Sequence, residues 1–167
     1  MVVAPKGNLI ANGDFELGKV GEAPECWEST NVLLVGSSQA FTGLQAAAMG
    51  AEVPLCPAVM YQDIPVFPGR RFLLSFQMAS LACTAGDLLV QVRWQNNSGC
   101  DLGPGLYVFI SGLSSGKPAD GLWQAQSHLT DFSPIDVCRA RVVFTRSPGK
   151  SRSSPTVIDA VTFADMN

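Results

Sequence analysis

The sequence predicts an all-β protein, an antiparallel β-sandwich or barrel, and three observations support this. Apolar and polar residues alternate with period two in most segments, while the helical period of 3.6 is scarce. Gly, Pro, Asn and Ser interrupt the chain at intervals of about 8–12 residues, as in all-β domains. No helical segments alternate with these runs, which argues against a parallel βαβ architecture.

The N-terminal third holds one ambiguous segment, residues 38–49. Its stretch Leu44 to Met49 suits a helix but is short and lies between Gly43 and Gly50, so a strand of small residues fits equally well.

Two strands are expected in the middle of the chain. Residues 59–67 end in the turn signal Pro68-Gly69, after which Arg70 to Ser80 reads as a strand with apolar residues on one side. Asp87 to Gln95 repeats the alternation.

The C-terminal half continues in the same way. Strands are expected within Leu106 to Ser111, Gly121 to Leu129, Arg139 to Thr145 and Thr156 to Phe163, with exposed loops at 117–120 and 149–155.

Length and charge narrow the class of protein. A chain of 167 residues suits one domain covering residues 1–167, and a net charge of -3 with 47% hydrophobic residues argues against disorder. Eleven basic against fourteen acidic residues leave no surplus to neutralise phosphates, so we expect no nucleic-acid partner. Without an apolar run of about 18 residues, no membrane insertion is expected either.

The N-terminal residues and the cysteines say little about the compartment. No export signal is visible, so the protein either stays inside the cell or is a piece of something exported by another route. The five cysteines form no Cys-x-x-Cys pair, and most are expected to be buried free thiols, with one or two disulfides left open.

Five sequence blocks, in order, resemble carbohydrate-binding modules with a galactose-binding-like jelly roll, the group that includes families four, nine, sixteen and twenty-two. The opening Asn8 to Glu16 is similar to that group's N-L-x-x-N-G-D-F-E signature. The other blocks are Thr42-Gly43 with Ala46 to Met49, Tyr61 to Phe76, Trp123-Gln124, and Val157 to Val161. The resemblance implies an antiparallel jelly-roll β-sandwich, a non-catalytic role, an extracellular or cell-surface location and a poly- or oligosaccharide partner.

A structural Ca²⁺ site is also implied by the resemblance. It assigns carboxylate ligands to Glu16 and Asp159, with backbone carbonyls near Asp14 and Thr42 as additional ligands. Ca²⁺ takes six to eight oxygen ligands, so such a site would clamp the two ends of the chain together. The alternative is that both carboxylates simply accept backbone N–H groups.

Polar residues opposite the apolar register are the candidate sugar contacts. They are Gln77, Gln91, Arg93, Gln124 and Gln126. If their strands are neighbours, these side chains line one concave sheet, and their amide-rich chemistry suits a neutral glycan. A solvated strand face is the alternative for each of them.

Aromatic residues that could stack on a sugar are hard to identify from the sequence. Trp94 shares the register of apolar residues and is expected in the core, and Trp27 and Trp123 are expected to be structural. The side to which Tyr107 and Phe109 point cannot be decided.

Catalytic motifs are not evident. His128 is the only histidine and alternates with glutamines on a strand, and no Gly-x-Ser-x-Gly elbow or complete phosphate-binding loop occurs. We therefore expect a carbohydrate-binding module rather than an enzyme. The alternative is a structural or assembly protein of a cell or spore surface that uses the jelly roll for protein contacts, and a homo-oligomer is left open.

Overall fold

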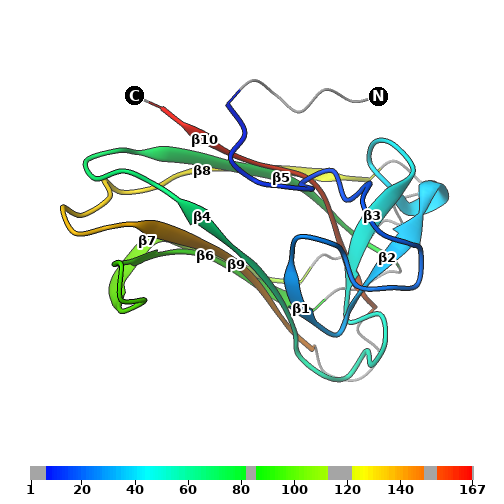
Figure 1. The fold of residues 1–167 in the computed structure, drawn as a ribbon. Coiled ribbons are helices and arrows are strands. Elements are labelled where there is room, and N and C mark those ends of the chain that lie inside the picture. Colours follow the sequence, from blue (N-terminus) through cyan, green and yellow to red (C-terminus); the bar gives the residue numbers. More distant parts are fainter. Residues whose placement is uncertain (1–6, 82–85, 113–121, 149–153, 167) are drawn as a thin grey trace.

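Two antiparallel five-stranded sheets pack against each other in the computed structural model (Figure 1), which describes residues 7–81, 86–112, 122–148 and 154–166. We name each sheet after an edge strand. The β7 sheet has the order β1 (Glu28–Thr30), β4 (Ala58–Pro65), β9 (Arg139–Ser147), β6 (Asp87–Gln95) and β7 (Asp101–Ile110). The β8 sheet has the order β2 (Val32–Gly36), β3 (Gln45–Met49), β10 (Thr156–Asp165), β5 (Phe72–Ser80) and β8 (Gln124–Leu129).

Aromatic residues from the inner faces of both sheets meet in the core. Phe76 of the β8 sheet contacts Phe144 of the β7 sheet edge-on, with ring centroids 5.1 Å apart. Phe72 stacks on Phe163 at 4.8 Å and also reaches Trp94 across the sandwich at 6.0 Å. These contacts confirm the predicted alternation in β5, β6 and β9, whose apolar residues bury one face of each strand.

The ambiguous segment 38–49 contains no α-helix. Residues Ser37–Gln39 form one turn of 3-10 helix, and Gln45–Met49 form β3 between β2 and β10. Ala46, Ala47 and Ala48 are all fully buried. Because β3 is covered on both faces, it lacks the alternation that marks a half-exposed strand, which explains why its pattern was ambiguous.

Strand β7 begins earlier than the sequence predicts, at Asp101 rather than Leu106. Its first half contains Gly103, Pro104 and Gly105, and the pairing with β6 shifts register between Val92 and Arg93. Proline is tolerated because β7 is an edge strand that needs no donor on its outer side. Bulges and proline hide such a segment from a search for strict alternation.

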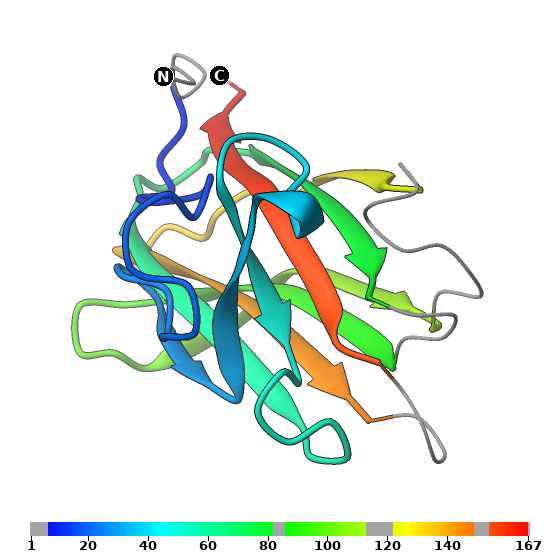
Figure 2. The same cartoon turned by 90° about the vertical axis from the view of Figure 1, so that its right-hand side faces the viewer.

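The start of the described chain runs beside the last strand, β10 (Figure 2), where Asn8 forms a bridge with Ala164. The Asn8 side chain donates to the Val161 carbonyl at 3.2 Å and accepts from the Phe163 amide at 2.8 Å. The opening motif is therefore tied to β10. Within the described ranges, no helix is long and apolar enough to cross a membrane.

The expectation of buried cysteines is wrong for the four that the structure describes. Cys26, Cys56, Cys100 and Cys138 are free thiols, as expected, but all four are exposed. They lie in loops just outside the strands, where a small apolar residue is not drawn into the core. Cys83 falls outside the described residues, as does the loop 117–120 and most of the loop 149–155.

Candidate ligand-binding face and carboxylate site

The outer face of the β7 sheet carries a row of side chains that crosses all five strands. Strand pairing places Glu28, Tyr61, Val143, Gln91 and Tyr107 directly opposite one another in that order. We call this the tyrosine row. With strands about 4.8 Å apart, the backbones of Tyr61 and Tyr107 are about 14 Å apart. The row therefore offers one aromatic residue near each end and an amide between them.

A second row lies beside the first. It contains Thr30, Val59, Thr145, Leu89 and Phe109. Tyr107 is 62% exposed and Phe109 is 61% exposed, so two aromatic side chains project from neighbouring positions on the edge strand. Exposed aromatic residues next to polar groups are typical of ligand sites.

The sequence left the direction of these two aromatic residues undecided because β7 is an irregular edge strand. Its inner side chains are only partly buried, so the residues that alternate with Tyr107 and Phe109 do not stand out as a core face. The register with β6 supplies the missing information, since Tyr107 lies opposite Gln91.

Charged residues form a third row on the same face. Arg141 lies between Asp63 and Arg93, and its guanidinium donates two hydrogen bonds of 2.7 Å to the Asp63 carboxylate. The hydrogen bond from Arg141, followed by its charge, holds the pKa of Asp63 below its ordinary value despite partial burial. The carbon of the Arg141 guanidinium lies 4.2 Å from the centroid of the Tyr61 ring, a cation–π contact that positions this tyrosine.

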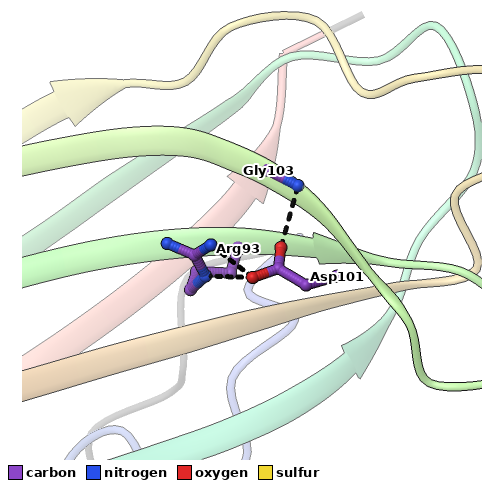
Figure 3. A network of polar contacts seen from close by, with 3 residues as sticks. All are labelled: Arg93, Asp101 and Gly103. Carbon is purple, nitrogen blue, oxygen red and sulfur yellow. Dashed lines mark hydrogen bonds and ion pairs between the residues drawn. The ribbon is translucent and has the colours of Figure 1, made fainter.

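Arg93 makes the equivalent contact on the other side of the row (Figure 3). Its Nε donates to Asp101 Oδ2 at 2.7 Å, and the other Asp101 oxygen accepts the Gly103 amide at 2.8 Å. The hydrogen bond from Gly103, and next the one from Arg93, keep the pKa of Asp101 below its ordinary value. Both carboxylates are therefore ionised and hold the arginines in place.

A shallow depression of about 160 Å³ lies at the β1 edge of the face. Its lining residues are Glu28, Ser29, Thr30, Val59 and Tyr61. It continues the tyrosine row past Tyr61, so a ligand that follows the row would end beside the Glu28 carboxylate.

The five candidate sugar contacts are divided between the two sheets. Gln91 and Arg93 lie on the outer face of the β7 sheet, as just described. Gln77 is on β5 in the β8 sheet, so it lies on the opposite side of the molecule. The expectation that all five line a single sheet is therefore wrong.

Gln124 and Gln126 point to the other side of the β8 sheet from Gln77. They lie opposite Met78 and Phe76, whose side chains face the core. The Gln126 Oε1 atom is 3.0 Å from the His128 Nε2 atom, and the His128 ring lies 6.5 Å from that of Phe76. Polar residues can face inward here because β8 is an edge strand and its inner face is only partly covered.

The three tryptophans have structural positions, as expected. Trp94 and Trp27 are buried, and the Trp27 Nε1 donates to the Asn12 carbonyl at 3.1 Å. Trp123 is half-buried and packs edge-on against Phe41, with centroids 5.5 Å apart.

Glu16 and Asp159 hold the same loop from two sides. The amides of Phe41 and Thr42 donate to Asp159 Oδ2 at 2.8 and 3.1 Å, while those of Leu44 and Gln45 donate to Glu16 Oε1 at 2.7 and 3.0 Å. Residues 41–45 thus lie between two carboxylates that come from opposite ends of the chain.

Burial raises the pKa of Asp159 to about 6, and the nearby negative charge of Glu16 adds to this effect although three backbone amides oppose it. Both carboxylates thus accept backbone N–H groups, which is the alternative to the Ca²⁺ site that the resemblance implies. The described residues contain no group of three or more acidic, histidine or cysteine side chains that could hold a metal, so Asp14 adds no third carboxylate. A Ca²⁺ ion would need Glu16, Asp159 and backbone carbonyls near Asp14 and Thr42 to complete its shell.

Comparison with known proteins relates the fold to solved structures. No protein-family model and no curated protein matches the chain. Among solved structures, the enzymatically active domain of tailspike protein 4 of bacteriophage CBA120 has a TM-score of 0.71 at 17% identity, over 98% of this chain but only 22% of that one.

Two carbohydrate-binding modules are similar over their whole length. A family 61 module in complex with β-1,4-galactotriose has a TM-score of 0.63 at 14% identity, covering 93% of this chain and 97% of that one. A family 16 module has a TM-score of 0.62 at 18% identity, covering 94% and 99%. The chain therefore has the jelly-roll β-sandwich fold of carbohydrate-binding modules.

Proposed function

We propose that this protein is a non-catalytic carbohydrate-binding module that binds a glycan across the outer face of the β7 sheet. The observation that carries the proposal is the exposure of Tyr107 and Phe109 beside Gln91. Aromatic rings can stack on the apolar side of a sugar ring, and amide side chains can hydrogen-bond its hydroxyl groups. Apart from Glu28, the tyrosine row and the row beside it contain no residue charged at neutral pH, which suits neutral sugar units.

The length of the tyrosine row favours an oligosaccharide over a single sugar. Tyr61 and Tyr107 are separated by three strand spacings, about 14 Å, which is more than one pyranose ring spans. The Arg141 guanidinium lies over the Tyr61 ring, 4.2 Å from its centroid, so this end of the row is positioned before a ligand arrives. A positioned aromatic side chain loses less conformational entropy on binding.

The alternative of a surface assembly protein is less well supported. The similar structures that cover this chain end to end include modules of families 61 and 16, which favour a carbohydrate partner. The tailspike domain is part of an enzyme, but His128 contacts Gln126 and packs near Phe76 without an activated nucleophile beside it among the described contacts.

Glycan-array screening followed by isothermal titration calorimetry tests the binding proposal. We expect Tyr107→Ala and Phe109→Ala each to weaken binding by about two- to tenfold, since an aromatic contact contributes about 0.5–1.5 kcal/mol beyond its buried area. Phe67→Ala is the matched control, because Phe67 is 75% exposed and lies in the connection between β4 and β5, outside the rows of this face. If no glycan binds at millimolar concentration, or if all three variants behave alike, the proposal fails.

We also propose a structural Ca²⁺ held by Glu16 and Asp159. Its support is the pair of carboxylates around residues 41–45 and the raised pKa of Asp159. Bound Ca²⁺ would neutralise both carboxylates and stabilise the folded state by an amount that grows with the logarithm of the Ca²⁺ concentration. Calorimetric melting should show a higher Tm with Ca²⁺ and a lower one with chelator, and an unchanged Tm would contradict the site.

A further inference from the structure

Two arginines on the outer face of the β7 sheet lie directly opposite each other. Arg93 on β6 pairs with Arg141 on β9, and both side chains are about one third exposed, at 34% and 33%. Like charges at directly opposite positions destabilise a sheet. The pair therefore needs an explanation beyond strand pairing.

Each arginine is held by an aspartate on its far side. Asp63 binds Nε and Nη2 of Arg141, and Asp101 binds the same two atoms of Arg93. In the part of the chain that the structure describes, the Nη1 group of neither arginine makes a hydrogen bond. A guanidinium has five N–H donors, so both keep donors available to a ligand.

A third arginine makes this part of the face positive. Arg139 precedes Arg141 by two residues on β9 and is close enough to Asp63 for its charge to lower the pKa of that carboxyl group. Arg93, Arg139 and Arg141 face two aspartates, which leaves one positive charge on a protein whose net charge is -3. We call these three residues the arginine cluster.

The arginine cluster lies beside the tyrosine row, where the sugar rings are proposed to bind. Arg93 and Gln91 are two positions apart on β6, and Arg141 contacts the Tyr61 ring. A group bound by the cluster would therefore be attached to a sugar that lies on the tyrosine row. Because guanidinium groups form paired hydrogen bonds with planar or tetrahedral oxyanions, the ligand chemistry that fits is a negatively charged oxygen group.

We propose that the arginine cluster binds an oxyanion substituent of the glycan, the carboxylate of a uronic acid or a sulfate ester. The inference rests on the proposed function and deepens it, because it names the class of glycan. An acidic polysaccharide would place sugar rings over the aromatic residues and a charged substituent of one of its sugars over Arg93 and Arg141.

Three polymers test the inference and separate the two oxyanions. The full chain is titrated with a neutral galactan, with polygalacturonate and with a sulfated galactan, each at low and high salt. We expect one acidic polymer to bind at least about tenfold tighter than the neutral one at low salt, because a hydrogen bond to a charged group is stronger than one between neutral groups. The preference should decrease as salt rises.

Variants connect any such preference to the cluster. Arg93→Gln should abolish the preference for the acidic polymer, because it removes one of the two guanidinium groups that would hold the oxyanion. Asp101→Asn removes the carboxylate that competes with the ligand for Arg93, so this variant should bind the acidic polymer more tightly. If the Arg93–Asp101 ion pair served only the structure, the variant would bind the acidic polymer more weakly. Arg70→Gln is the control, because Arg70 pairs with Asp165 of the other sheet. Circular dichroism verifies that each variant is folded.

The outcomes distinguish the two proposals. Equal binding of neutral and acidic polymers, or a preference that survives Arg93→Gln, overturns this inference and leaves the carbohydrate-binding proposal standing. Failure of all polymers and of the glycan array overturns both.

Discussion

Gln91 and Tyr107 lie directly opposite each other on β6 and β7, so an amide and an exposed phenol ring share the outer face of one sheet. The pairing joins a residue singled out from the sequence with one whose orientation the sequence left undecided. It is also the centre of the proposed binding face, because Val143 and Tyr61 extend the same row toward β1.

Replacing Gln91 tests whether this face is the one that binds. Gln91→Ala should weaken glycan binding by about two- to tenfold, the effect of losing one or two hydrogen bonds of about 0.5–1.5 kcal/mol. Gln77→Ala is the matched control, because Gln77 is also a half-buried glutamine but lies on the β8 sheet. Titration calorimetry measures the affinity of both variants. A larger loss of affinity for Gln77→Ala than for Gln91→Ala would contradict the proposal, because the site would then lie on the β8 sheet.

The raised pKa of Asp159 predicts a stability change with pH in metal-free protein. Its pKa is about 6 in the folded state against an ordinary 3.8, so the folded protein holds this proton more tightly than the unfolded chain. The free energy of unfolding should therefore fall as pH rises from about 4 to about 6, by about 3 kcal/mol in total.

Calorimetric melting between pH 4.5 and 7 in chelator measures this change. The window avoids more acidic solutions, where Asp63 and Asp101, whose pKa values are lowered, lose their stabilising charge as pH falls. Asp159→Asn should remove most of the dependence. An equal slope in the variant would show that another group is responsible.

Replacing Gly105 on β7 by a larger residue should disturb the packing of the core. A Cβ atom at Gly105 would overlap the indole of Trp94, which is buried on the neighbouring strand. Gly105→Ala should lower the free energy of unfolding by about 1–3 kcal/mol through overpacking. Gly36→Ala, where a Cβ meets nothing within 4 Å, should change it by less than about 0.5 kcal/mol. Urea titration compares the two, and equal values would contradict the steric explanation.

Replacing Arg146 should lower the free energy of unfolding for a different reason, the loss of buried hydrogen bonds. It is fully buried at the end of β9, its guanidinium donates to the Pro54 and Ser154 carbonyls at 3.1 and 3.0 Å, and burial lowers its pKa. Arg146→Met should cost about 1–3 kcal/mol per carbonyl left without a donor. Arg139→Met, at a half-buried position of the same strand, should cost little. If Arg146→Met is as stable as the parent protein in urea, its hydrogen bonds to the Pro54 and Ser154 carbonyls do not stabilise the fold.

Much of the fold could be predicted from alternation. In β5 and β6, residues of one parity are buried and the others face outward, which confirms the predicted faces of Gln77, Gln91 and Arg93. Alternation failed where burial is two-sided, as in β3, and where an edge strand is bulged or half-covered, as in β7 and β8. In those strands the side chains of both parities meet similar surroundings, so no contrast remains in the sequence.

The sequence by itself determined the all-β architecture and the jelly-roll resemblance, and that resemblance singled out Glu16 and Asp159, which the structure places on either side of residues 41–45. Only the tertiary structure decided which polar residues share a surface. Strand order places β6 beside β7 and β9 but puts β5 and β8 in the other sheet, which separates Gln91 and Arg93 from Gln77, Gln124 and Gln126. The physical reason is that alternation reports which side of its own strand a residue occupies, while the neighbour on that side is set by pairing between segments far apart in the chain.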